Sequence, residues 1–231
     1  MKSQILYEDS AILVAVKPAG LPVQTKKIGV MDMVSELKNY LMKKQEKELY
    51  VIHRLDQPVE GLLVFAKNAG AASSLTAQVG LAKDEDKMLK IYQAKIYGHM
   101  PEAKGKLVDW MQMDVAENQS IIVSAPKETV REAKKNLASK LKPKEARLEY
   151  EVLEQDELTE TLRIHLLTGR HHQIRLQLSH AGHPILGDLK YGNKESIAFA
   201  KTLGIRNVAL KAIHLEFRHP ESGERMVFDF I

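Results

Sequence analysis

The chain contains no cysteine among its 231 residues. This absence excludes disulfide bonds, thiolate metal sites and cysteine nucleophiles, and it is typical of proteins kept in a reducing compartment. We therefore expect a cytoplasmic protein.

Long hydrophobic runs and targeting signals are also absent from the sequence. No apolar run approaches the roughly 18 residues of a membrane-spanning helix. The first residues, 1–18, lack the apolar core and the cleavage site of a secretory signal peptide. We therefore expect no association with a membrane.

The glycine-rich motifs that bind nucleotide phosphates are missing too. The sequence has no Gly-x-Gly-x-x-Gly and no phosphate-binding loop, so a role in binding dinucleotides or ATP lacks support. We expect a protein that uses no cofactor.

The composition is that of a soluble globular protein, with 44% hydrophobic and 28% charged residues. The length allows one large domain or two small ones. The net charge of +4 is unevenly placed, because residues 131–147 carry seven Lys and Arg against two Glu. This basic run is either a solvated helix face or tether, or an arm that contacts phosphates.

Hydrophobic periodicity predicts short, mixed elements. Strands are expected at 4–7, 11–17, 49–53, 61–67, 88–98, 105–113, 120–126, 146–155, 158–168, 207–219 and 224–230. Helices are expected at 31–44, with Met31, Val34, Leu37 and Leu41 on one stripe, at 69–82 and at 171–181. Strands joined mostly in hairpins, with helices between them, predict an α+β fold with a mixed, largely antiparallel sheet and flanking helices.

A polar string precedes one of the most apolar strands. His53-Arg54-Leu55-Asp56 lies directly before the run that starts at Gly61. Arginine beside an aspartate keeps the carboxylate ionised, and an anion fixed in this way can act as a nucleophile or a base. For Asp56 taken alone, the alternative is a turn-capping residue that pairs with Arg54 at the surface.

Four segments together resemble the RluA-type pseudouridine synthases of the RsuA/RluA-like superfamily. They are the Lys-Pro-Ala-Gly loop at residues 17–20, the His-Arg-Leu-Asp segment at 53–56, the Lys-x-Tyr at 90–92 and the stretch "LLTGRHHQIRLQLSHAGHPILGDLKYG" at 166–192. Residues 211–224 are similar to the closing strand and turn of that family. The resemblance covers nearly the whole chain in the family's order.

The resemblance implies an isomerase that converts uridine to pseudouridine in structured RNA, either ribosomal or transfer RNA. It implies that Asp56 is the essential carboxylate, that Tyr92 stacks on the base, and that Arg175 pairs with the aspartate. Arg54 corresponds to the residue that fills the gap left by the flipped base. The resemblance further implies that His53, Arg170 and His172 contact the RNA, and that no cofactor or metal is used.

Two positions depart from the family pattern. Val59-Glu60 stands where Thr-Ser usually precedes the glycine, and His171 stands where Thr or Ser is common. Neither residue is one that the chemistry requires, so the departures bear on which RNA is held.

The domain organisation expected from the resemblance is one catalytic domain over residues 1–231. It carries a basic insertion at about 127–147, and we expect no separate N-terminal RNA-binding domain. A monomer is the default expectation.

Three alternatives to an active pseudouridine synthase have less support in the sequence. A metal site formed by the histidines at 171, 172, 180 and 183 lacks an acidic ligand at suitable spacing. An inactive RNA-binding protein on the same fold would not need Asp56, Tyr92 and Arg175 intact. A glycosidase-like hydrolase would use Asp56 with Glu60 as its two acids. Apart from Glu60, no residue in the sequence supplies a second acid at a defined place.

Overall fold

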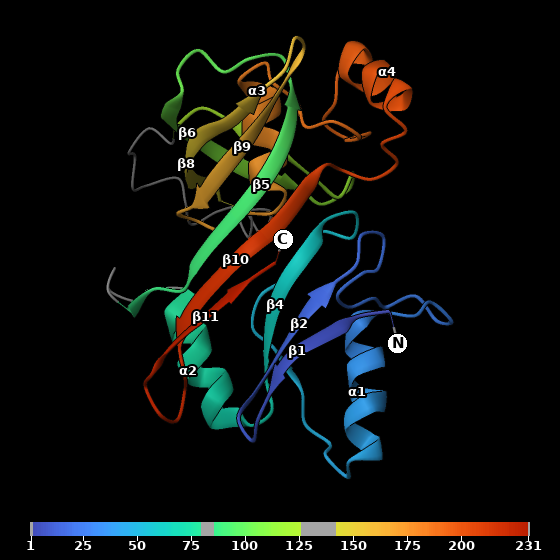
Figure 1. Cartoon of the computed structure of the whole chain (residues 1–231), viewed down its shortest axis with the longest axis vertical. Helices are drawn as coiled ribbons and strands as arrows, with labels where there is room; N and C mark the ends of the chain where they lie inside the picture. Colours follow the sequence, from blue (N-terminus) through green and yellow to red (C-terminus); the bar gives the residue numbers. More distant parts are fainter. Residues whose placement is uncertain (1, 80–85, 126–141, 231) are drawn as a thin grey trace, which may run out of the picture. The chain divides into compact units, whose positions relative to one another are not determined.

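The structure is a computed structural model that describes residues 2–79, 86–125 and 142–230. The chain divides into two compact units, Met1–Gln93 with Leu210–Ile231, and Ala94–Ala209. The C-terminal strands therefore return to the unit in which the chain begins. Figure 1 shows this return, with β10 lying alongside β4. The expectation of one catalytic domain over residues 1–231 stays a prediction.

The first unit is built on a sheet with the strand order β1-β2-β4-β10. Two further strands attach to it, β3 to β4 and β11 to β10. The parallel pair is β4 with β10, whereas β1–β2, β2–β4, β3–β4 and β10–β11 are antiparallel. The strands are β1 (Gln4–Glu8), β2 (Ile12–Lys17), β3 (Tyr50–Val51), β4 (Glu60–Ala66), β10 (Leu210–Arg218) and β11 (Arg225–Asp229). A longer strand, β5 (Leu89–Tyr97), begins in this unit and ends in the other.

The core of the first unit explains the apolar run in β4. Val14 and Val64 belong to one hydrophobic cluster, and α2 (Ala69–Val79) contributes Leu75 to it. The alternate residues Leu13 and Leu63 are also 0% exposed. Because both faces of β2 and β4 are covered, these strands are apolar at consecutive positions rather than at every second one.

Helix α1 (Met33–Lys43) begins later than the periodicity predicted. Asp32 is its N-cap and accepts hydrogen bonds from the Ser35 N–H at 2.7 Å and the Thr25 N–H at 2.8 Å. A capping aspartate at this position ends the preceding loop, so Met31 lies outside the helix and is 52% exposed. The inclusion of Met31 in the buried stripe was therefore wrong, whereas Val34, Leu37 and Leu41 are buried as predicted.

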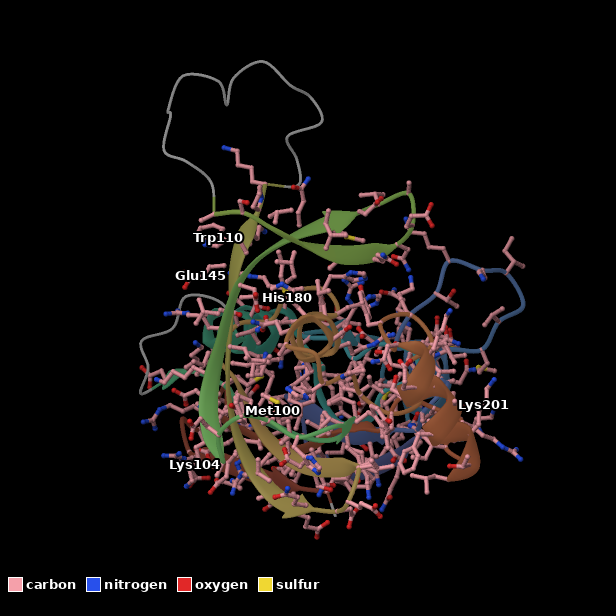
Figure 2. The ribbon with its side chains drawn as sticks, turned by 90° about the horizontal axis from the view of Figure 1, so that it is seen from above. Met100, Lys104, Trp110, Glu145, His180 and Lys201 are labelled. Atoms are coloured by element: carbon pink, nitrogen blue, oxygen red, sulfur yellow. The ribbon has the colours of Figure 1, made fainter. Side chains whose placement is uncertain are left out.

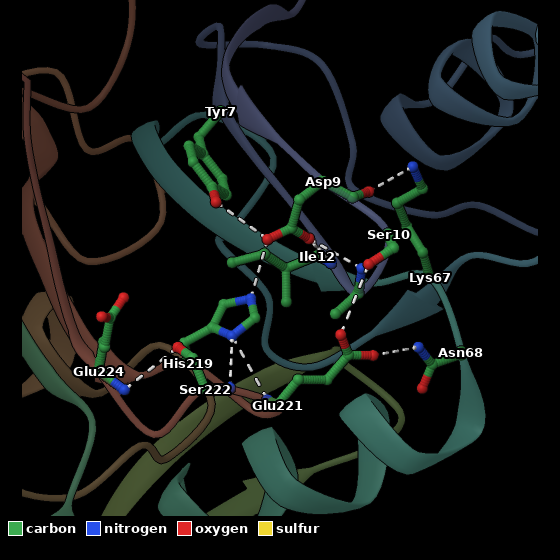
Figure 3. Close-up of polar contacts among 11 residues, drawn as sticks. Tyr7, Asp9, Ser10, Ile12, Lys67, Asn68, His219, Glu221, Ser222 and Glu224 are labelled. Carbon is green, nitrogen blue, oxygen red and sulfur yellow. Dashed lines mark hydrogen bonds and ion pairs between the residues drawn. The ribbon is translucent and has the colours of Figure 1, made fainter.

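A polar cluster ties two turns together at the end of the sheet where β2 begins (Figure 3). The Asp9 carboxylate accepts hydrogen bonds from the Tyr7 hydroxyl at 2.9 Å and from the Ile12 N–H at 2.8 Å. His219 Nε2 lies 2.9 Å from the same carboxylate, and the Ser222 N–H donates to His219 Nδ1 at 3.1 Å. Since Nδ1 accepts, Nε2 carries the proton donated to Asp9. The cluster joins the β1–β2 turn to the β10–β11 turn.

The second unit contains an antiparallel sheet with the order β9-β8-β6-β7. The predicted β8–β9 hairpin is confirmed, with the Asp156 N–H bonded to the Thr159 carbonyl at 2.8 Å. A helix that the periodicity did not predict, α4, is capped by Asn193, whose side chain accepts from the Ser196 N–H at 2.8 Å. The elements are β6 (Lys104–Asp114), β7 (Gln119–Val123), β8 (Lys144–Gln155), β9 (Thr159–Leu166), α3 (Gln173–His180) and α4 (Lys194–Thr202).

Helix α3 is fixed to this sheet by polar contacts. Gln177 Nε2 donates to Asp109 Oδ2 at 2.8 Å, and His180 Nδ1 lies 3.0 Å from the other oxygen of that carboxylate. Figure 2 labels His180 together with Trp110, which follows Asp109 on β6 and lies opposite Glu145 on β8. These contacts set the orientation of α3 relative to β6.

The fold class is confirmed: the described residues form mixed, mostly antiparallel sheet with helices α1 to α4 beside it. Two predictions reach outside the described ranges. Most of the basic insertion at about 127–147 falls on residues 126–141, and the end of the predicted 69–82 helix falls on residues 80–82. Across the described ranges, no helix is both long and apolar enough to cross a membrane.

Candidate active site

Asp56 lies in the loop that joins β3 to β4. Val51 of β3 pairs with Phe65 near the end of β4, so the loop runs back along β4 and enters that strand at Glu60. Leu55 and Val59, on either side of Asp56, are 8% and 2% exposed, and the Val59 N–H donates to the Asp56 carbonyl at 3.0 Å. Two buried anchors and one turn therefore hold the half-buried Asp56 at the head of β4.

A buried lysine joins this loop to the Lys-Pro-Ala-Gly loop. Lys17 is 0% exposed, and its Nζ donates to the carbonyls of Pro18 at 3.0 Å, Leu21 at 2.7 Å and Gln57 at 2.9 Å. The Gly20 N–H also donates to the Gln57 carbonyl, and Gln57 Nε2 donates to the Gly20 carbonyl. The residue after Asp56 is thus fixed by backbone and side chain. The sequence pattern placed both loops in the motif set but did not predict this contact.

The three hydrogen bonds of Lys17 Nζ form a clamp on the loop, and electrostatics link this clamp to Asp56. Burial lowers the pKa of Lys17 to about 8, while the negative charges of Asp56 and Glu60 act to raise it. Lys17 therefore lies within electrostatic range of both carboxylates.

Tyr92 also lies within electrostatic range of Asp56. It lies on β5 and is 6% exposed. Burial raises the pKa of Tyr92 above its ordinary value, and the negative charge of Asp56 raises it further. The first unit therefore brings the predicted carboxylate and the predicted tyrosine together, with the phenol kept protonated at neutral pH.

The remaining predicted residues of this loop differ in exposure. Arg54 is exposed. His53 is half-buried, and its Nε2 accepts a hydrogen bond of 3.4 Å from the Val64 N–H. Burial and the positive charge of Lys90 lower the pKa of His53 to about 3, so the ring is neutral and carries its proton on Nδ1. His53 therefore contacts the protein backbone, and its contact with RNA stays a prediction.

Lys90 is a residue that the motif contained and the sequence reading did not single out. It precedes Tyr92 by two positions on β5, so both side chains project from the same side of the strand. Burial and the nearby charge of Lys87 lower the pKa of Lys90 to about 8. A lysine with a depressed pKa beside a predicted catalytic tyrosine is a functional-site signal.

In the second unit, Arg175 on α3 is buried and forms a bidentate ion pair. Its guanidinium donates to the two oxygens of Asp188 at 2.7 and 2.8 Å, and the two side chains are 6% and 1% exposed. Asp188 also accepts the backbone N–H groups of Lys190 and Tyr191. Burial opposes ionisation of Asp188, but these partners lower the pKa of its carboxyl. Arg175 is thus not a surface helix arginine, and its pairing with Asp56 stays a prediction.

The start of α3 has an uncommon backbone. His172 has φ +53, in the left-handed region, which delays the helix to Gln173 rather than residue 171. His172 Nδ1 lies 2.9 Å from the Tyr191 hydroxyl, and its ring stacks on His171 at 3.7 Å between centroids. The Arg175 guanidinium lies over the Tyr191 ring at 5.2 Å. Tyr191 therefore connects two predicted site residues, and no sequence signal pointed to it.

Arg170 lies just before this helix. Its Nε donates to the Glu145 carbonyl at 2.8 Å, and its N–H donates to Gln173 Oε1 at 3.0 Å. Arg170, His172 and Arg175 thus gather around the start of α3. Within residues 2–79, 86–125 and 142–230, no group of three or more His, Cys, Asp or Glu side chains has the arrangement of a metal site.

Comparisons with known proteins agree with this class of fold. A family model described as RNA pseudouridylate synthase matches residues 11–180. The structure of human RNA pseudouridylate synthase domain containing 4 matches 99% of this chain and 88% of its own, with a TM-score of 0.73 and 21% identity. At that identity the likeness shows the fold. The chain belongs to the RNA pseudouridylate synthase family.

Two curated relatives narrow the comparison. Ribosomal large subunit pseudouridine synthase C of Haemophilus influenzae is 28% identical, over 99% of this chain and 65% of that protein. Dual-specificity RNA pseudouridine synthase RluA of Vibrio parahaemolyticus is 29% identical, over 99% of this chain and 88% of that protein. The resemblance to RluA-type enzymes is confirmed. The chain spans slightly less than two thirds of the Haemophilus relative.

Proposed function

We propose that this protein is an RNA pseudouridine synthase that isomerises uridines in structured RNA. The observation that carries the proposal is the placement of Asp56 on a loop clamped by Lys17 and within electrostatic range of the buried Tyr92. Membership of the pseudouridylate synthase family supports it.

The proposed reaction is balanced without any co-reactant. The bond between N1 of uracil and C1′ of ribose breaks, the base turns, and a bond forms between C5 and C1′. The hydrogen on C5 leaves as a proton, and N1 takes up a proton. Asp56 would either attack C1′ or remove a proton from the sugar, and both routes need an ionised carboxylate against the ribose.

Tyr92 would stack on the target base. Because its pKa is raised by burial and by Asp56, the phenol is protonated while Asp56 is charged. The C5–C1′ bond forms as any ester between Asp56 and C1′ breaks, which returns the negative charge to Asp56. Tyr92 would help to move the C5 proton after that bond has formed.

The other site residues would hold the RNA. Arg54 is exposed and would fill the space left in the stack by the flipped nucleotide. Arg170, His172 and Arg175 gather at the start of α3, where cationic and hydrogen-bonding groups suit contacts to phosphate or ribose. We propose that Arg175 also pairs with Asp56 when RNA is bound.

Ribosomal RNA is the substrate that we propose. The Haemophilus relative is named for the large ribosomal subunit. Transfer RNA is the second candidate that the resemblance implies, and the Vibrio relative is named a dual-specificity RNA enzyme.

The test is tritium release from RNA labelled at C5 of uracil, prepared from cells that lack this protein. Native protein should release tritium, and Asp56→Asn should lower the rate by at least about 10³-fold. Asp229→Asn, which changes an exposed aspartate of the same unit, should keep the native rate.

The other outcomes separate the alternatives. RNA that is bound without tritium release would indicate an inactive RNA-binding protein. Free uracil among the products would indicate hydrolysis with Asp56 and Glu60. If the protein neither binds RNA nor releases tritium, the RNA assignment is contradicted.

A further inference from the structure

The charge on the buried Lys17 ammonium is not balanced by the groups it bonds. All three acceptors of its Nζ are neutral backbone carbonyls, those of Pro18, Leu21 and Gln57. A cation buried in this way needs negative charge nearby to remain ionised. The carboxylates that act on it are those of Asp56 and Glu60.

The strand register explains why Glu60 is close. Lys17, at the end of β2, pairs with Gly61 of β4, and Glu60 is the residue before that glycine. On the other side of β4, Glu60 pairs with Lys211 of the parallel strand β10, and Lys211 Nζ lies 3.5 Å from Glu60 Oε2. Glu60 is therefore directly opposite Lys211 on β10 and one residue away from the position opposite Lys17 on β2.

Glu60 is also one of the two departures from the family pattern. The resembling enzymes usually have Thr-Ser before the glycine, where this chain has Val59-Glu60. The chain thus carries a negative charge at a position where the family pattern that it resembles has a neutral hydroxyl. The mechanism proposed above does not use this charge.

We propose that Glu60 is a positioning residue, which keeps Lys17 in its ammonium form and so holds the Asp56 loop in place as the pH rises. This inference rests on the proposed function of Asp56. An ammonium has three N–H donors for its three carbonyls, whereas a neutral amine has two. Deprotonated Lys17 must release one carbonyl, which loosens the contact between the Gln57 loop and the Lys17–Gly20 loop.

Other charged groups around Lys17 determine whether its amine or its ammonium form is favoured. Burial lowers the pKa of Lys17 to about 8, and Asp56 and Glu60 oppose that change. Lys211 offsets part of the Glu60 charge. Tyr92, which faces Asp56, is kept neutral because burial and Asp56 raise its pKa. Removal of the Glu60 charge therefore favours the neutral amine, and removal of the Lys211 charge favours the ammonium.

The experiment compares Glu60→Gln with Lys211→Met by single-turnover pseudouridine formation between pH 6 and 10. Both substitutions break the same ion pair, so a merely structural role moves both rate profiles in the same direction. The proposal requires opposite shifts. We expect the alkaline limb to move down by about half a pH unit in Glu60→Gln and up by a similar amount in Lys211→Met. Glu221→Gln, at the other end of the unit, should keep the native profile.

Two outcomes overturn the inference. They are shifts in the same direction and no shift in either variant, in which case the limb reports another group such as Lys90, whose pKa is also about 8.

A second measurement separates this inference from the proposed function. In protein labelled with ¹³C-lysine, the Cε resonance that disappears in Lys17→Arg reports the titration of Lys17. Its midpoint should fall in Glu60→Gln and rise in Lys211→Met. If native protein makes no pseudouridine, the proposed function fails, while this titration still decides whether Glu60 controls the charge of Lys17. An unchanged midpoint overturns the inference whatever the activity.

Discussion

At the scale of single residues, Lys17 and Arg175 are buried cations that the protein stabilises in different ways. Arg175 has a direct carboxylate partner, with two hydrogen bonds to Asp188. Lys17 has only carbonyl oxygens within bonding distance, and its charge depends on carboxylates farther away. A bidentate pair is insensitive to pH near neutrality, whereas a carbonyl-bonded lysine is not. The charge of Lys17 can therefore change with pH near neutrality, whereas the charge of Arg175 on α3 stays fixed.

The buried pair makes a residue-scale prediction. Asp188→Asn removes the bidentate carboxylate partner of the buried Arg175 guanidinium, so we expect the free energy of unfolding to fall by about 3 to 5 kcal/mol. Urea denaturation measures it. Asp156→Asn breaks the ion pair between Lys95 and Asp156, whose side chains are 36% and 66% exposed, and should cost less than about 1 kcal/mol. Equal losses in the two variants would contradict this account of Arg175.

At the scale of elements, the position of β4 depends on its close approach to β10 at Gly61. Gly61 has φ +132, and a Cβ built on it would lie 2.3 Å from the carbonyl oxygen of Ala212 on β10. No L residue with a side chain fits there without moving backbone. The glycine therefore sets the separation between β4 and β10 directly after the Asp56 loop.

The matching prediction concerns this strand pair. Gly61→Ala adds both an unfavourable φ and an overlap with backbone, so we expect a loss of about 2 to 4 kcal/mol in stability and a lower rate of pseudouridine formation. Gly223→Ala isolates the φ cost, because Gly223 has φ +73 with no atom within 4 Å of an added Cβ. It should cost about 1 kcal/mol. Thermal unfolding of both variants measures the difference. If Gly61→Ala costs no more stability than Gly223→Ala, the close-approach argument is contradicted.

At the scale of the whole molecule, the chain is organised by long-range returns. The last two strands complete the sheet started by the first two, and Asp9 and His219 join the turns of those two hairpins. Charged groups support this arrangement near the same turn. Glu8 accepts hydrogen bonds from Lys44, Lys67 and Tyr40.

These bonds predict how stability depends on acid. Burial opposes ionisation of Glu8, but the bonds to Lys44, Lys67 and Tyr40 lower its pKa to about 2. A carboxyl with a folded pKa below its unfolded value stabilises the protein above the unfolded value and loses that contribution as pH falls. We expect about 1 to 2 kcal/mol to be lost between about pH 4.5 and 2. Glu8→Gln should flatten that part of the stability curve, and Glu102→Gln, an exposed glutamate, should leave it unchanged.

Local patterns were sufficient for most elements and failed where a local feature competed with the period. The α1 stripe was right at Val34, Leu37 and Leu41, but the Asp32 cap excluded Met31. The α3 helix was placed two residues early, because the left-handed backbone of His172 has no signature in hydrophobic periodicity. Helix α4 was missed, since it buries only Ser196 and Ala200 and so shows a weak apolar stripe.

The sequence by itself determined the fold class, the family and the loop that carries Asp56, because those follow from short motifs and from apolar runs. Only the tertiary structure decided which residues surround that loop. The contacts of Lys17 with Gln57, of Arg175 with Asp188 and of Glu60 with Lys211 join positions far apart in the chain or on neighbouring turns. Such contacts depend on strand register and on burial, and charge becomes decisive only once water has been removed from around it.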